Sequence, residues 1–282
     1  MSEMAVRDTT ATLAAAQVRS GARARRIPSW LRWGAWLPTV VTFLIAALLW
    51  QIVAWTNPYV LPTLDAIAGS LGQDAGMYGS NFLTTLLEVV VGAAIGIVAG
   101  FALAVVMAEF ALIERAVMPL VIIVMVTPIV AIAPALVVAF GFGMIPKFIV
   151  TALVVFFPML VNSLAGLRDV DKRALDVFKT LHASRWEIFR ELRFPGSMPY
   201  VFAGLRIALP LAVVGAAVAE FVAAGQQAGL GSLVTTSAAQ ANLPVTWASI
   251  TLLCVLGVLL IVLLAVARKR VLWWSDGEVT AK

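Results

Sequence analysis

The sequence predicts an all-α polytopic membrane protein with six transmembrane helices, on the strength of three observations. Hydrophobic residues make up 62% of the 282 residues and charged residues only 12%, whereas soluble domains carry about half and about a quarter. The mean hydropathy is +0.99. The few charges are separated by long charge-free runs, several of which exceed the roughly 20 apolar residues that cross a bilayer. Collagen-like, disordered and disulfide-scaffold proteins are excluded by this composition, and the single cysteine, Cys254, forms no internal disulfide.

The charge-free runs, divided where polar, proline or glycine residues gather, place the predicted helices in order. The first run contains the apolar core 39–55, and the last is divided by the polar, glycine-rich stretch 225–246. The predicted spans are 37–56, 81–108, 116–140, 147–166, 201–224 and 247–267. Together they form a six-span domain over 37–267, preceded by a basic tail (1–36) and followed by a short tail (268–282).

Glycine and proline positions predict how individual spans are shaped. Gly92, Gly96 and Gly100 recur every four residues in the second span, so they lie on one face and allow another helix to approach closely. Thr127-Pro128 and Pro134 interrupt the third span, and Pro158 with Asn162 interrupts the fourth. Proline frees carbonyl groups that must be satisfied locally or line a cavity.

The lysine and arginine distribution predicts the orientation, because cytoplasmic loops of membrane proteins are enriched in these residues. With both termini placed inside, all of the 20 basic residues except Lys147 lie on or near the cytoplasmic side. The sequence therefore predicts a multi-pass membrane protein with cytoplasmic termini. The net charge of +5 then reflects topology and indicates no nucleic-acid partner.

The loop 167–199 is the one large polar segment, and it predicts two short amphipathic helices. Its first part places apolar residues at helical spacing, up to a break at His182-Ala183. Ser184 followed by Glu187 is the pattern of a capping box, which predicts a helix from Arg185 to Arg193 that ends at Phe194-Pro195. By composition, such helices either lie on lipid headgroups or dock into a groove of a soluble partner.

Residues 176–210 resemble the EAA loop of ABC-importer permeases. The matching positions are Asp176, Leu181, Ala183, Ser184, Trp186, Phe189, Pro195, Pro199, Gly204 and Leu205. The segments 127–143 (TPIVAIAPALVVAFGFG), 156–167 and 219–234 are similar to further segments of the nitrate/sulfonate/taurine branch, which includes riboflavin and thiamine-precursor importers. Two departures are Val177-Phe178, where the family has small residues, and His182, where it usually has the glycine that permits a turn.

The resemblance implies a type I ABC-importer permease fold with both termini inside. It implies a homodimer that forms the path for a small polar or anionic solute, with two ABC ATPase subunits and an external solute-binding protein as partners. No GxxxxGK[ST] loop is present, so ATP and Mg are expected on the ATPase and no cofactor on this chain. The implied ATPase-coupling residues are Asp176, Leu181, His182, Ala183, Ser184, Arg185, Trp186, Glu187 and Phe189.

Glu88 and Glu220 are the clearest acidic residues inside predicted spans, and an intramembrane charge indicates function by default. Glu220 lies between charge-free stretches. It either lines the path or makes a structural hydrogen bond, whereas Glu88, near the start of its span, is expected at the membrane interface. The candidates for the substrate path or gate are Thr127, Pro128, Asn162 and Glu220. The stretch 225–246 is expected to be either a re-entrant or short external helix near the mouth, or an ordinary loop.

Two other classes of function were weighed. An ion-coupled secondary transporter or channel without an ATPase is the alternative, but it predicts inverted repeats, and 37–140 and 147–267 show no convincing repeat. A membrane-embedded enzyme is less favoured, because the chain has one histidine and neither a catalytic set nor metal-ligand spacing. The sequence does not identify the solute.

Overall fold

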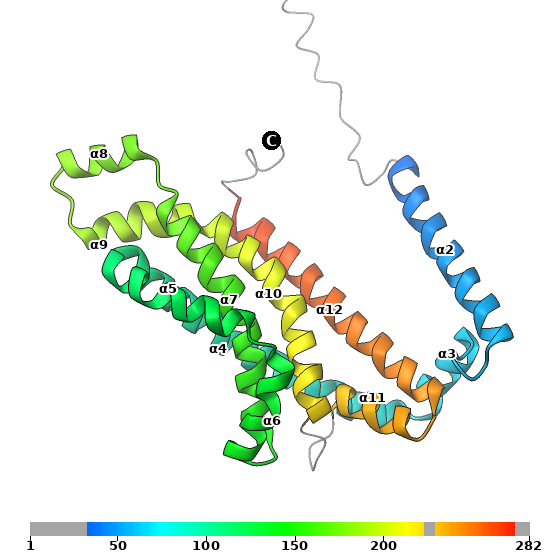
Figure 1. Cartoon of the computed structure of the whole chain (residues 1–282). Helices are drawn as coiled ribbons and strands as arrows, with labels where there is room; N and C mark the ends of the chain where they lie inside the picture. Colours follow the sequence, from blue (N-terminus) through cyan, green and yellow to red (C-terminus); the bar gives the residue numbers. More distant parts are fainter. Residues whose placement is uncertain (1–32, 223–228, 274–282) are drawn as a thin grey trace, which may run out of the picture. The chain divides into compact units, whose positions relative to one another are not determined.

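The computed structural model describes residues 33–222 and 229–273, and these residues are helical with no strand among them (Figure 1). The all-α prediction is confirmed for this part of the chain. Most of the predicted N-terminal tail and the end of the C-terminal tail lie outside the described residues. Five described helices are long and apolar enough to cross a membrane, and a bent pair supplies a sixth if it is counted as one span.

The chain divides into two units, of which the first ends at Leu61. Its described helix is α2 (Trp33–Thr56). From Leu37 onward most of its leucine, isoleucine and valine side chains are exposed, which suits a helix surrounded by lipid. Thr42 donates its hydroxyl to the Pro38 carbonyl at 2.8 Å, so a carbonyl near the helix start is satisfied without water.

The second unit begins at Pro62 and contains the other helices that the structure describes. In chain order they are α3 (Leu64–Gln73), α4 (Ala75–Glu109), α5 (Ala111–Val126), α6 (Ile129–Phe140), α7 (Met144–Arg168), α8 (Lys172–Thr180), α9 (Arg185–Ile188), the π-helical turn η2 (Phe189–Arg193), α10 (Phe194–Val222), α11 (Leu230–Ala239) and α12 (Leu243–Val271). α3 was not predicted. A hydrogen bond of 2.6 Å between the Ser70 and Tyr78 hydroxyls joins α3 to the start of α4.

Helices α4, α7 and α10 pack together as the centre of this unit (Figure 1). The glycine row of α4 faces α7: a Cβ atom on Gly96 would lie 2.4 Å from the Ala152 carbonyl oxygen, and one on Gly100 would lie 2.7 Å from that of Phe156. Neither gap admits a side chain. The close helix approach predicted from the four-residue glycine spacing is therefore confirmed.

The region predicted as one helix over 116–140 is two helices, α5 and α6, which meet at an angle of 95°. Thr127, between them, has extended backbone angles of φ −68° and ψ 126°. A residue before proline is disfavoured in the helical region, and Pro128 has no N–H to donate. The predicted interruption at Thr127-Pro128 is thus a sharp corner.

The predicted end of the short helix at Phe194-Pro195 is wrong, because the chain continues as a helix from Arg185 through η2 into α10. The Phe194 N–H bonds to the Phe189 carbonyl, five residues back. This wider turn comes directly before Pro195, whose ring would otherwise clash with a carbonyl of the preceding turn. A π-helical turn thereby allows the proline without ending the helix.

Candidate functional site

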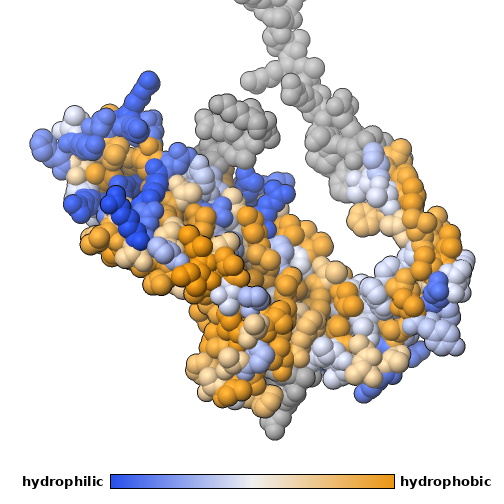
Figure 2. Space-filling model, in the orientation of Figure 1, coloured by the Kyte–Doolittle hydropathy of each residue, from blue (hydrophilic) through white to orange (hydrophobic). Residues whose placement is uncertain are grey.

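The polar segment after α7 folds as α8 and α9 at one end of the second unit. Hydrophilic residues gather on this end, whereas hydrophobic residues cover the surface of the long helices (Figure 2). Asp171 directly precedes α8 and caps it, because its carboxylate accepts the Arg173 N–H at 2.9 Å. The polar segment therefore has its own helix start signal.

His182 forms the turn between α8 and α9 and has φ +56°. This is the left-handed region, which is uncommon for residues other than glycine, although histidine is enriched there. The turn is closed by two backbone bonds of 3.0 Å, from His182 N–H to the Lys179 carbonyl and from Ala183 N–H to the Phe178 carbonyl. His182 thus adopts the conformation for which glycine is the usual residue.

The capping box predicted at the start of α9 is confirmed. The Ser184 N–H donates to the Glu187 carboxylate at 2.7 Å, and the Glu187 N–H donates to the Ser184 hydroxyl oxygen at 3.2 Å. The bonds from the Ser184 backbone, and then from its hydroxyl, hold the pKa of Glu187 below its usual range. Glu187 is therefore a charged cap that orients a very short helix.

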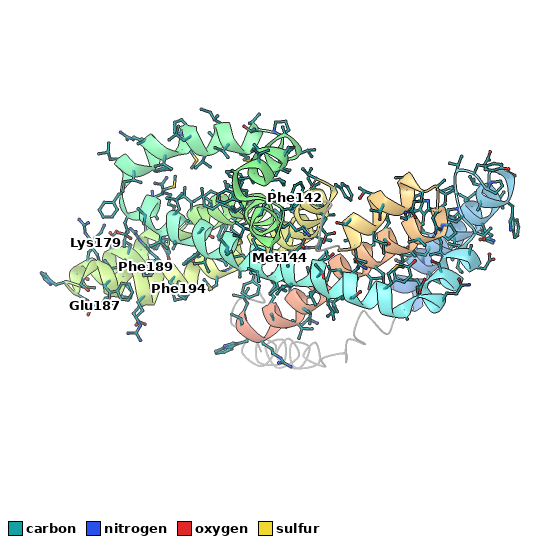
Figure 3. All side chains as sticks on the ribbon, turned by 90° about the horizontal axis from the view of Figure 1, so that it is seen from below. Phe142, Met144, Lys179, Glu187, Phe189 and Phe194 are labelled. Carbon is teal, nitrogen blue, oxygen red and sulfur yellow. The ribbon has the colours of Figure 1, made fainter. Side chains whose placement is uncertain are left out.

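A row of aromatic rings leads from α9 into the long helices. Trp186 is 67% exposed and stacks on Phe189, with 5.6 Å between the ring centroids. Phe189 lies 6.1 Å from Phe194, which makes an edge contact with Phe101 of α4 at 6.0 Å. Figure 3 shows Phe189 and Phe194 near Lys179 and Glu187 at this end. An exposed tryptophan is thus connected to the packed core by direct ring contacts.

Ion pairs fasten the same end to α4 and α5. Arg193 donates to Glu109 at 2.5 Å, and Arg168 binds both carboxylate oxygens of Glu114. A cavity of about 300 Å³ lies between α8, α9 and the end of α4; its charged lining residues are Glu109, Lys179, Arg185 and Arg193. The base of the segment is therefore attached, while its outer surface is open.

The nine residues that the EAA resemblance implies lie together in α8, α9, η2 and the turn between them. Asp176 is exposed and pairs with Lys179 at 3.1 Å. Leu181 is exposed at 72%, and Arg185 is also exposed. Exposed apolar side chains beside charged ones form a surface that fits a protein partner.

Glu220 is fully buried and holds the start of α11. Its carboxylate accepts the Thr85 hydroxyl at 2.7 Å, the Ser232 N–H at 3.2 Å and the Gly231 N–H. The Thr85 hydroxyl oxygen in turn accepts the Leu230 N–H at 2.9 Å. The carboxylate therefore makes the structural hydrogen bonds that were one of its two predicted roles, and its partner Thr85 was missed.

Glu88, which was expected at the membrane interface, is buried between helices. Its side chain is 0% exposed and binds Lys147 at 2.8 Å, and the lysine side chain is 1% exposed. Burial of either charge alone is very unfavourable, so the two side chains require each other. Lys147 was also the exception to the predicted distribution of basic residues. Its buried partner explains why a lysine is present at the start of α7.

The remaining path candidates are engaged locally. The Thr127 hydroxyl donates to the Ile123 carbonyl at 2.9 Å, and Pro128 directly precedes α6. The Asn162 amide donates to the Pro158 carbonyl at 2.8 Å. Thus Thr127 and Pro128 shape the corner between α5 and α6, whereas Asn162 lies on α7 and Glu220 on α10.

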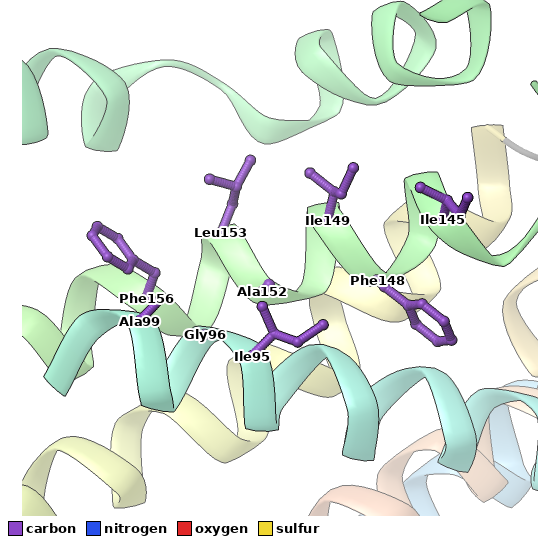
Figure 4. A pocket seen from close by; sticks show the side chains of 9 residues that line it. All are labelled: Ile95, Gly96, Ala99, Ile145, Phe148, Ile149, Ala152, Leu153 and Phe156. Carbon is purple, nitrogen blue, oxygen red and sulfur yellow. The ribbon is translucent and has the colours of Figure 1, made fainter. Parts of the chain in front are cut away.

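An apolar groove of about 360 Å³ lies along α4 and α7 (Figure 4). It is lined by the residues Ile95, Gly96, Ala99, Ile145, Phe148, Ile149, Ala152, Leu153 and Phe156. None of these side chains can hydrogen-bond or carry a charge. The groove therefore offers no group that recognises a polar solute.

Comparison with known proteins matches residues 92–272 to the family described as binding-protein-dependent transport system inner membrane component. The chain is 34% identical to the formylaminopyrimidine transport permease protein ThiX of Halalkalibacterium halodurans, over 79% of this chain and 90% of the relative. It is 31% identical to a probable ABC transporter permease protein of Haemophilus influenzae, over 74% and 86%. The identity to the riboflavin transport system permease protein RibX of Chloroflexus aurantiacus is 28%, over 83% and 89%.

Proposed function

The chain belongs to the family of binding-protein-dependent transport system inner membrane components, and we propose that two copies form the path of an ATP-driven importer. As a member of this family it is a multi-pass ABC-importer permease of the inner membrane. Separate ATPase subunits and an external solute-binding protein are the partners of such a permease. The homodimer, the cytoplasmic termini and the coupling residues are parts of the proposal.

The exposed Trp186 on a capped helix is the observation that carries the ATPase-coupling part. An aromatic side chain exposed at 67% is a favourable anchor for a protein interface, and Arg185 and Glu187 supply a charged rim. The capping box fixes the direction of α9. We assign Trp186 to the cleft of an ATPase subunit, which is the second of the two roles left open by composition.

The continuity of α9, η2 and α10 supports a route for movement from the ATPase to the membrane. A displacement of α9 is applied directly to α10, because no loop separates them. The contacts of Phe194 with Phe101 and of Arg193 with Glu109 apply it also to α4. Closure of two ATPases on ATP then switches the paired permeases between inward-open and outward-open states.

The proposed cargo is a small polar or anionic solute released by the binding protein at the end that carries α11. The relatives are named for formylaminopyrimidine and riboflavin, which are small polar heterocyclic compounds. The local bonding of Asn162 and Thr127 supports a path that recognises cargo weakly. Selection then resides mainly in the binding protein.

Replacement of Trp186 by alanine tests the coupling part. The Trp186→Ala permease, reconstituted with its ATPase and binding protein, is expected to insert normally but to lose ATP-dependent uptake. Trp55→Ala is the matched control, since Trp55 is 69% exposed on α2 and has no place in this proposal. Uptake by Trp186→Ala at the parental rate would overturn the coupling assignment. Uptake that follows an ion gradient and ignores ATP would favour the secondary-transporter alternative.

A further inference from the structure

We infer that Thr85 and Glu220 are positioning residues that clamp α11 between α4 and α10, so that α11 closes the outer mouth until these two helices separate. The clamp itself is independent of the proposed function, whereas its opening during transport rests on that function. The clamp gives a role to the buried carboxylate, to a threonine that no sequence pattern indicated, and to the glycines at the start of α11.

The clamp joins three helices through two side chains. Thr85 is on α4 and Glu220 on α10, and their side chains bond to each other at 2.7 Å. Both also accept N–H groups from the first turn of α11: Thr85 from Leu230, and Glu220 from Gly231 and Ser232. Any separation of α4 from α10 must therefore break the Thr85–Glu220 bond, and it removes at least one of the bonds that hold the start of α11.

The glycines are required by the closeness of the carboxylate to the backbone. A Cβ atom on Gly229 would lie 2.0 Å from a Glu220 oxygen, and one on Gly231 would lie 2.7 Å from the other oxygen. The Cβ atom on Gly231 would also lie 2.9 Å from the Ala217 carbonyl oxygen, which belongs to the same helix, α10. The segment 229–231 therefore packs directly on Glu220, with no room for a side chain between them.

The carboxyl group of Glu220 and the start of α11 stabilise each other through hydrogen bonds. The first N–H groups of a helix have no partner within the helix, and they carry the positive end of its dipole. Inside a membrane protein such groups must be satisfied by the protein itself. The carboxyl group of Glu220 meets the first need here, and the nearby Glu88 on α4 binds Lys147.

The C-terminal end of α11 is attached to α12 by bonds of its own, so the clamp holds only the N-terminal end of α11. The Ser237 and Thr246 hydroxyls bond at 2.8 Å, and the Asn242 N–H donates to the Ser237 carbonyl at 2.9 Å. When the Thr85–Glu220 clamp opens, α11 remains held at its α12 end. It is therefore built to swing about that end as a lid.

The first test measures the clamp in the permease alone. Val234→Cys in a Cys254→Ser background places one thiol on α11, and its labelling rate by a maleimide is followed in membranes without nucleotide.

Thr85→Val and Glu220→Gln, which keep side-chain shape, are expected to raise the labelling rate several-fold. Thr85→Ser keeps the hydroxyl and should restore the parental rate. Thr84→Val is the matched control, because the exposed Thr84 hydroxyl bonds only to the Ser80 carbonyl of its own helix.

The second test measures opening in the assembled transporter. Labelling of Val234→Cys is compared between the nucleotide-free state and a vanadate-trapped state. The parent is expected to label faster in the vanadate-trapped state, in which α4 and α10 are separated at the outer end. Thr85→Val should remove the difference by labelling fast in both. Parental labelling rates in Thr85→Val and Glu220→Gln would overturn the clamp. Labelling that ignores nucleotide while ATP-dependent uptake continues would overturn the lid, and loss of ATP dependence itself would instead overturn the proposed function.

Discussion

Arg193 in η2 donates to Glu109 at the end of α4 across 2.5 Å, and each side chain is 26% exposed. The pair joins the turn that follows α9 to the helix that carries Phe101 and Thr85. It therefore lies between the proposed ATPase contact and the core.

Neutralisation of Glu109 is expected to impair coupling more than stability. A partly exposed ion pair is worth about 1 kcal/mol or less, so Glu109→Gln should lower the thermal stability of the purified permease only slightly. ATP-dependent uptake should fall several-fold while ATP hydrolysis continues, because α9 is less firmly tied to α4. The double variant Glu109→Arg, Arg193→Glu should recover uptake. Glu191→Gln, whose partner Arg190 is exposed, is the control and should behave as the parent.

Loss of Lys147 is expected to destabilise the permease strongly. Lys147→Ala leaves the fully buried Glu88 carboxylate without its cation, and breaking a buried pair costs about 3 to 5 kcal/mol. Yield and thermal unfolding in detergent measure this loss, and Glu88→Gln added to Lys147→Ala should recover part of it. Lys179→Ala removes one partner of an exposed pair and should change stability little. Equal stability of the two lysine variants would contradict the structural role of Lys147.

Features that depend on nearby residues could be predicted from the sequence, and those that depend on distant residues could not. The Ser184–Glu187 capping box and the glycine row of α4 are set by spacings of three and four residues. Thr85 and Glu220 are separated by 135 residues, and Glu88 and Lys147 by 59. No local pattern pairs them. The sequence did contain one signal: Lys147 lies away from the side that carries the other basic residues, and Glu88 lies within a predicted span. Each of these charges requires a partner.

The helix predicted to end at Pro195 shows a different limit. Proline is a reliable sign of a helix end only when the preceding turn has ordinary α geometry. Here η2 supplies a wider turn, and the contacts of Phe189 and Phe194 with the long helices accompany it. Tertiary packing therefore decides whether the proline ends the helix, and the sequence alone does not reveal that packing.

His182 is expected to tolerate glycine but not valine. Its left-handed backbone, φ +56°, is disfavoured for residues with a Cβ atom by about 1 to 2 kcal/mol, and glycine relieves this strain. Glycine also gains freedom in the unfolded chain, so the stability of His182→Gly should stay within about 1 kcal/mol of the parent. Valine is branched at Cβ and opposes the turn. His182→Val should therefore misplace α9 and reduce the solute imported per ATP hydrolysed, whereas His182→Gly keeps this ratio.

The glycine row of α4 predicts a contrast between two glycine-to-alanine changes. In Gly96→Ala the new methyl group would lie 2.4 Å from the Ala152 carbonyl oxygen, which is backbone and cannot rotate away. The helices α4 and α7 must then move apart, at a cost of about 1 to 3 kcal/mol. Gly257 on α12 has no neighbouring atom within 4 Å of that position, so Gly257→Ala should raise helix stability by up to about 1 kcal/mol. Thermal unfolding of both variants in the same detergent measures the contrast. A Gly96→Ala permease as stable as Gly257→Ala would mean that α4 and α7 are not in backbone contact in the native protein.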